Sequence, residues 1–228
     1  ESGGTAKAEV IKTHHNRVEG IQRLIEAGRL VEPLAQLYKD EVRQVGAALG
    51  LPAALLDRHP FPGPGLAIRC LATATEGYAE AVPGGYLLPV QSVGVQGDSR
   101  TYRLTLALPR YSEEAFATAT ELINQRTDIN RVVALAGGAE PLGAYRSYPS
   151  VLDETRLERL RQCDAIVRRM SEEAGFEEQV WQFPIVLIPC GVVGKPDSVV
   201  LRPIHSVDGM TAQAVAMPAE LLRRMVEE

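Results

Sequence analysis

The sequence predicts an α/β segment followed by an α+β domain with two related strand-strand-helix-strand units. Residues 18–49 carry apolar side chains at helical spacing. Residues 72–85 are rich in glycine and small side chains, which indicates a domain boundary. The order strand, strand, helix, strand is predicted for residues 90–135 and begins again at residue 185. We therefore assign residues 1–70 to the C-terminal part of the α/β domain.

Two helices are expected in the α/β segment. Residues 18–27 place apolar side chains on one helical face and stop before Gly28, and residues 39–49 do the same and stop before Gly50. Both helices are expected to cover the last part of a parallel sheet. Residues 30–31 offer a short strand, or the lead-in to one, between them.

A proline-rich turn joins the two parts of the chain at residues 59–69, with the sequence HPFPGPGLAIR. Its three prolines fix φ, while the neighbouring glycines leave φ free, so a helix and a regular strand are both excluded. We expect a rigid connection, with His59 helping to orient it.

The first strand-strand-helix-strand unit begins with strands at residues 90–96 and 102–108. The second of these strands alternates large apolar side chains with polar or small ones, which predicts a sheet with one solvated face. A helix at residues 113–124 and a strand at residues 132–135 complete the unit.

A long helix that Asp153 caps and Gly175 closes precedes the second unit. Strands follow at residues 185–188 and 198–202, and Pro218 opens a last helix. If the second unit matches the first, a further strand is expected after the last helix.

Composition narrows the class of protein. A net charge of -5 and a pI near 5.5 argue against broad nucleic-acid binding, and no basic stripe with interleaved aromatic residues occurs. The sequence has no apolar run of about 18 residues, so it predicts no membrane-spanning helix. Cys70, Cys163 and Cys190 fit neither a disulfide framework nor zinc spacing, so we expect structural thiols in a reducing cytoplasm. The chain begins at Glu1 without methionine, which suggests a fragment.

Six sequence words occur in one order along the chain: IKTHHN (11–16), LVEPL (30–34), KDEVR (39–43), HPFPGPGLAIR (59–69), SVGVQGDSRTY (92–102) and LRPIHSVDGMTA (201–212). Together they resemble the glutamine-hydrolysing GMP synthetase family. The resemblance implies that residues 1–70 end an adenine-nucleotide hydrolase-like parallel α/β domain, the ATP-pyrophosphatase domain, with a lid over its active site. It also implies that residues 71–228 form the longer type of dimerisation domain, with an incomplete second repeat.

Two parts of the family pattern are missing. Ser2, Gly3 and Gly4 start like the pyrophosphatase P-loop SGGxDS, but Thr5 and Ala6 stand where its Asp and Ser are required. The Lys-Pro-Pro and Glu-Trp-Glu tail of the family is also absent. The chain alone is therefore expected to be inactive.

The resemblance implies an ATP-dependent ligase. In the family, ATP adenylates the C2 oxygen of xanthosine 5′-monophosphate (XMP), pyrophosphate leaves, and ammonia displaces AMP to give GMP. ATP, Mg²⁺, ammonia from a glutamine amidotransferase domain or subunit, a homodimer and a cytoplasmic location are implied with it. Two alternatives stay open: an ATP-pyrophosphatase paralogue that acts on another substrate, and a non-catalytic dimerisation module.

The lid residues Lys12, His14 and His15 are the catalytic candidates that the resemblance implies, because a cation and two imidazoles there would approach the triphosphate and the adenylated base. An exposed loop of this composition is more often only solvated. We expect no metal site, since adjacent histidines do not easily face one metal and no carboxylate cluster accompanies them.

Lys39 and Asp40 begin a predicted helix, where free backbone N–H groups favour phosphate. The resemblance implies that they lie near ATP and pyrophosphate. The alternative is an ordinary charged first turn.

Asp98, Gln182 and Arg100 are the XMP-binding candidates that the resemblance implies. The segment around Asp98 also has the composition of a simple turn between two strands. Arg100 and Arg202 either bind phosphate or pair with surface acids.

Overall fold

A computed structural model of the 228-residue chain describes residues 19–34, 36–37, 39–56, 65–96, 99–138, 141–206 and 213–228. The chain divides into two compact units, residues 1–58 with 97–99 and residues 59–96 with 100–228. The proline-rich stretch 59–64 and the predicted lid, residues 1–17, lie outside the described residues.

The N-terminal unit shows helices in its described residues: α1 (Glu19–Glu26), α2 (Lys39–Ala48) and α3 (Ala53–Leu56). Both predicted helices are therefore confirmed. Gly28 has φ of 66° and its N–H donates to the carbonyl of Ile25 at 2.9 Å, as expected where a helix ends. Residues 30–31, expected as a short strand or the lead-in to one, are irregular, so the strand itself is not found there. The parallel sheet stays a prediction.

A four-stranded sheet forms one half of the C-terminal unit, in the order β2 (Glu80–Val82), β3 (Gly85–Gln96), β4 (Ser99–Leu108) and β5 (Ile129–Ala134). β2 and β3 are antiparallel, whereas β4 and β5 are parallel. Helix α5 (Glu113–Gln125) connects β4 to β5 and packs against β5. Its N-cap residue Ser112 accepts from the N–H of Ala115 at 3.3 Å.

The other half is built on a two-stranded antiparallel sheet, β7 (Ile185–Ile188) and β9 (Ser198–Leu201). Helix α6 (Glu154–Glu173) precedes it, and Asp153 caps this helix by accepting from the N–H of Arg156 at 2.8 Å. Helix α7 (Ala219–Glu227) ends the chain, with Pro218 at its N-cap. These elements match the predicted strands and helices, while the relation between the two halves as repeats stays a prediction.

Short elements complete the C-terminal unit. Helix α4 (Leu66–Arg69) follows the proline-rich turn, and Arg69 donates to Asp164 of α6 at 2.6 Å and to the carbonyl of Ile185 at 3.2 Å. The remaining short strands and 3-10 helices are β1 (Gly77–Tyr78), η3 (Leu142–Ala144), β6 (Arg146–Ser147), η4 (Glu177–Gln179), β8 (Cys190–Gly191), β10 (Ile204–His205) and β11 (Gln213–Ala214).

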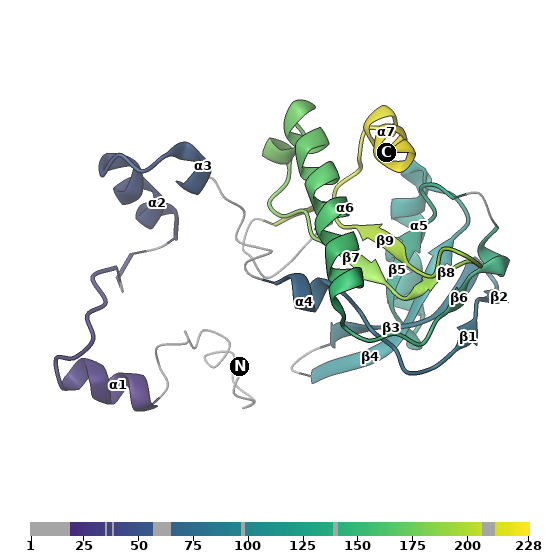
Figure 1. The fold of residues 1–228 in the computed structure, drawn as a ribbon, viewed down its shortest axis with the longest axis horizontal. Helices are drawn as coiled ribbons and strands as arrows, with labels where there is room; N and C mark the ends of the chain where they lie inside the picture. The colour runs from purple at the N-terminus through teal and green to yellow at the C-terminus, as the bar shows by residue number, and fades with distance from the viewer. Residues whose placement is uncertain are drawn as a thin grey trace. The chain divides into compact units, whose positions relative to one another are not determined.

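Two hydrophobic clusters hold the C-terminal unit together. In the first cluster, α6 and α7 cover the face of β7 and β9 that carries Ile185, Leu187 and Leu201. Figure 1 shows α6 running across β7. In the second cluster, Val186 and Val200 on the opposite face pack against β3, β4 and β5.

The second cluster corrects the expectation of a solvated sheet face. Thr105 is 6% exposed and Ala107 is 1% exposed, although they stand at the positions that the alternation predicted to face water. The face is buried because the sheet of β7 and β9 packs on it. Alternation along one strand does not reveal this cover, since small side chains also suit a close contact between two sheets.

Candidate functional site

The structure describes only part of the predicted site. Lys12, His14, His15 and Asp98 lie outside the described residues. For Lys39, Asp40 and Arg100 the structure describes the backbone alone: Lys39 and Asp40 are the first two residues of α2, as predicted, and Arg100 is the second residue of β4. The roles of all seven residues therefore stay predictions.

Gln182 is held in place by its backbone. Its N–H donates to the carbonyl of Ile204 at 3.2 Å, and the N–H of Ile204 donates back to the carbonyl of Gln182 at 2.9 Å. This bridge fixes Gln182 just before β7, and its side chain is half-buried. A Gln amide at such a rigid position supplies both donors and an acceptor.

Arg202 lies directly after β9 and is tied to the same segment, because its N–H donates to the carbonyl of Pro184 at 3.0 Å. If the alternation of β9 continues by one residue, the side chain of Arg202 lies on the sheet face that carries Val186 and Val200. Burial, and then the positive charge of Arg131, lower the pKa of Arg202 to about 10. Arg202 is thus a desolvated cation beside a second cation.

Arg131 was not a sequence-based candidate. It lies in β5 opposite Thr105 of β4, and burial lowers its pKa. Its Nη2 donates to the carbonyl of Val93 at 3.5 Å, which is the weak end of a hydrogen bond. The signal in the sequence was a lone arginine inside the apolar stretch of residues 129–135.

Two further polar atoms near this end of the sheet are buried without a hydrogen-bond partner: Oγ of Ser92 and Nη1 of Arg103. Ser92 lies on the same face of β3 as Leu88 and Val90, and Arg103 on the same face of β4 as Thr105. A buried hydroxyl or guanidinium atom without a partner is unusual. We call Ser92, Arg103, Arg131 and Arg202 the arginine cluster.

Asn130 fixes the arms of the β3–β4 connection in which Asp98 lies. Its Nδ2 donates to the carbonyl oxygens of Ser92 and Thr101, each at 2.9 Å, and its Oδ1 accepts from the hydroxyl of Thr101 at 3.0 Å. A Cβ on Gly94 would lie 2.5 Å from Cγ of Asn130, so this position needs glycine. Asn130 therefore joins β3 at Ser92 to β4 at Thr101.

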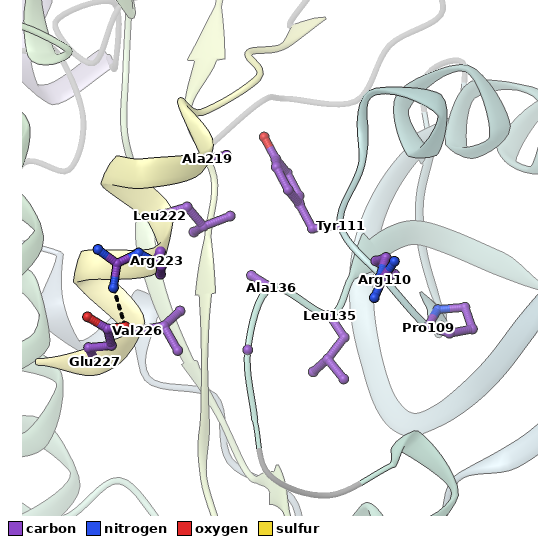
Figure 2. Close-up of a pocket in the computed structure, with 11 residues that line it drawn as sticks. Pro109, Arg110, Tyr111, Leu135, Ala136, Ala219, Leu222, Arg223, Val226 and Glu227 are labelled. Atoms are coloured by element: carbon purple, nitrogen blue, oxygen red, sulfur yellow. Dashed lines mark hydrogen bonds and ion pairs between the residues drawn. The ribbon is translucent and has the colours of Figure 1, made fainter.

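A cavity of about 570 Å³ lies elsewhere in the C-terminal unit, between α7 and the segments that follow β4 and β5. Figure 2 shows Tyr111 and Leu222 pointing toward each other across it, with the ion pair of Arg223 and Glu227 at one side. None of the predicted site residues lines this cavity. Its mixed lining gives no reason to assign it a ligand.

The cysteines are free thiols. Burial raises the pKa of Cys70 and Cys163, and it raises the pKa of Cys190 to about 12. A raised pKa disfavours the reactive thiolate, which agrees with structural thiols.

Within the part of the chain that the structure describes, no group of three or more His, Cys, Asp or Glu side chains could hold a metal ion. No helix among these residues is long and apolar enough to span a membrane.

The C-terminal unit defines a protein of the mixed α/β class in which the sheet of β7 and β9 packs on the four-stranded sheet. No model of a known protein family matches the chain. A probable glutamine-hydrolysing GMP synthase of Leptospira interrogans is 39% identical over 99% of the chain. Glutamine-hydrolysing GMP synthases of Glaesserella parasuis and Aromatoleum aromaticum are 40% and 38% identical over 60% and 62% of it.

These similarities confirm the predicted relation to the GMP synthetase family: the chain is homologous to part of the length of its members. It spans 40% of the Leptospira protein and 33% to 34% of the other two.

Proposed function

We propose that the chain forms the C-terminal part of an enzyme that converts XMP to GMP by ATP-dependent amination. ATP adenylates the C2 oxygen of the purine and pyrophosphate leaves; ammonia then attacks C2, and AMP departs with the oxygen. The observation that supports this proposal is the 39% identity over 99% of the chain to a protein named probable GMP synthase. The chain alone is proposed to be inactive.

The proposed ATP site uses Lys39 and Asp40 at the start of α2 together with the lid residues Lys12, His14 and His15. The first N–H groups of a helix have no partner within the helix and attract phosphate. Bound Mg²⁺ neutralises phosphate charge, and such a site needs only one or two carboxylates, because the phosphates supply other ligands. Asp40 is the carboxylate in this set that could contribute.

The proposed XMP site uses Asp98 and Arg100 at the β3–β4 connection and Gln182 before β7. Support comes from the described residues around these positions: Asn130 joins Ser92 of β3 to Thr101 of β4, and Ile204 holds the backbone of Gln182. A carboxylate and an amide can recognise a purine through hydrogen bonds and keep it aligned for adenylation. The partners proposed with XMP are ammonia from a glutamine amidotransferase domain or subunit, and a second copy in a cytoplasmic homodimer.

The experiment uses the full-length protein that contains this sequence. AMP and pyrophosphate release from ATP is measured with ammonia, in the presence and absence of XMP. Release that requires XMP, with GMP as the product, supports the proposal. Release that requires another acceptor overturns it in favour of a paralogue with a different substrate, and a folded protein with no release favours a non-catalytic dimerisation module.

Residue roles are tested separately. Asp98→Ala and Gln182→Ala should each weaken XMP binding by about 1 to 3 kcal/mol, because each leaves a buried polar group of the nucleotide unpaired. Gln179→Ala is the matched control, since Gln179 is exposed and its side-chain amide donates to the carbonyl of Gly175 at 3.1 Å, away from Gln182. Unchanged affinity in Asp98→Ala or Gln182→Ala removes that residue from the site.

A further inference from the structure

The arginine cluster is a concentration of hydrogen-bond donors at the contact between two sheets. Arg131 lies on β5 two residues before Val133, and Arg202 lies two residues after Val200 of β9. Val133 and Val200 pack in the same hydrophobic cluster. Side chains two residues apart on a strand share a face, so Arg131 and Arg202 extend this contact at one end.

The electrostatics agree with this placement. The charge of Arg131 is one of the two causes that lower the pKa of Arg202, so the two guanidinium groups are close enough to repel each other. Burial is the first cause for Arg202, and it also lowers the pKa of Arg131. The fold therefore tolerates two like charges in a partly desolvated position.

The cluster contrasts with other arginines of the C-terminal unit. Arg69 pairs with Asp164 at 2.6 Å, and Arg156 lies 2.9 Å from Asp197. No carboxylate partner of this kind occurs for Arg131 or Arg202 among the described residues. Both arginines are half-buried. A partly desolvated cation without a counter-charge is costly, and a bound anion would offset that cost.

The polar atoms around the two arginines can also donate hydrogen bonds. Oγ of Ser92 and Nη1 of Arg103 are buried and have no hydrogen-bond partner. A guanidinium only donates, and a hydroxyl can donate, so the whole cluster presents donors. A guanidinium pairs with the oxygens of a carboxylate or a phosphate alike, but two cations and two further donors suit a phosphate better, because it carries more charge and more acceptor oxygens than a carboxylate.

We propose that Arg131 and Arg202, with Ser92 and Arg103 beside them, form a binding site for a phosphate group at the contact between the four-stranded sheet and the sheet of β7 and β9. The ligand is either inorganic phosphate or the phosphate of a nucleoside monophosphate. The four residues of this site are not among those proposed for ATP and XMP above, although Arg202 is hydrogen-bonded through its N–H to the segment that carries Gln182. It rests on the described residues alone and not on the proposed function.

The test is phosphate binding by the full-length protein, measured by isothermal titration calorimetry at fixed ionic strength. Arg202→Gln and Arg131→Gln should each lower the affinity of this site for inorganic phosphate by about tenfold or more, since each removes charge-assisted hydrogen bonds. Arg110→Gln is the matched control, because Arg110 is exposed and lies outside the cluster. Equal phosphate binding in all these proteins overturns the proposal.

A second readout separates a ligand site from a structural role. In phosphate-free buffer, Arg202→Gln should raise the melting temperature, because it removes one of two repelling and desolvated charges, whereas phosphate should stabilise the unaltered protein more than the variant. An arginine that pairs with a carboxylate of the chain would give the opposite result, a lower melting temperature in both buffers, and that result overturns the proposal.

A crystal soaked in tungstate locates the anion. Anomalous density for tungstate between Arg131 and Arg202 supports the site. Anomalous density found only at other places in the protein overturns it. Titration with phosphate and with a nucleoside 5′-monophosphate then identifies the source: equal affinities indicate free phosphate, and tighter binding of the nucleotide indicates that the sugar or base is also contacted. Because these measurements record binding and not turnover, their failure would leave the proposed function untouched.

Discussion

The two compact units differ in how they bury their apolar side chains. In the C-terminal unit, Phe183, Ile185 and Leu187 are fully buried within clusters that join helices and sheets. In the N-terminal unit the described helices carry amphipathic stripes, yet Val45 is 39% exposed and Leu49 is 78% exposed. Similar apolar patterns along the chain therefore lead to different degrees of burial. An apolar face stabilises a helix only where another element covers that face.

The largest expected effect sharpens this comparison. Phe183→Ala should lower the free energy of unfolding by about 3 to 5 kcal/mol, because it leaves a cavity in a closely packed core. The ring of Phe183 is fully buried and meets that of Phe176 edge to face, with centroids 5.8 Å apart. Urea unfolding followed by circular dichroism measures the change. A loss below about 1 kcal/mol, as for a surface position, would contradict the assigned core.

A smaller effect is expected from Tyr111→Phe. The hydroxyl of Tyr111 accepts from the N–H of Met217 at 2.7 Å and donates to its carbonyl at 3.3 Å, which joins the segment after β4 to the segment before α7. Removing it leaves both groups of a buried residue unpaired and should cost about 1 to 3 kcal/mol in urea unfolding. Tyr102→Phe is the control, because Tyr102 is 65% exposed. Equal stability of the two variants would show that the bridge contributes nothing.

The pH dependence of one surface pair tests whether exposed groups of the C-terminal unit add stability. Two hydrogen bonds from Arg126, at 3.0 and 2.6 Å, lower the pKa of Asp128 below 3.8. A lowered pKa means that the stabilisation is present above about pH 4 and is lost as the pH falls through the folded-state value. Because Asp128 is 51% exposed, solvent limits the gain to about 0.2 to 1 kcal/mol.

Carbon-detected NMR titration of the side-chain carboxyl measures this pair. Arg126→Ala should return the pKa of Asp128 toward 3.8 and lower stability slightly at pH 7, with no difference from the unaltered protein near pH 2. If the titration of Asp128 is the same in both proteins, the ion pair does not form in solution.

The smallest effect is expected in the N-terminal unit. Val45→Ala in α2 should change the free energy of unfolding by no more than about 0.5 kcal/mol, since the side chain is 39% exposed and alanine favours a helix. The measurement is the same urea titration used for Phe183→Ala. A loss near that of Phe183→Ala would break the comparison, because it would reveal a buried face on α2.

Most elements could be predicted from the sequence because their signals are local. The N-cap at Asp153, the helix end at Gly28 and the strands at residues 185–188 and 198–202 were all found in the structure. The strand at residues 30–31 was not, because a pair of apolar residues fits an irregular segment equally well. The two-residue strands were missed for a related reason, since a pairing so short leaves no periodic pattern.

For the candidate sites too, some features could be predicted from the sequence and others could not. Gln182 entered through the resemblance to a family, and the structure explains only why its backbone is rigid. Arg131 carried no motif, so its significance depends on Arg202, which is remote in sequence and near in space. A contact between distant residues has no local pattern from which it could be read.

The sequence by itself determined the positions of the main helices and strands, the absence of a basic stripe, and the relation to the GMP synthetases, because periodicity, composition and motif words are properties of neighbouring residues. Only the tertiary structure decided that both faces of the sheet around Thr105 and Ala107 are buried and that the charge of Arg131 acts on Arg202. The physical reason is that burial and charge repulsion depend on which sheet packs against which, and that choice is made by contacts between residues far apart along the chain.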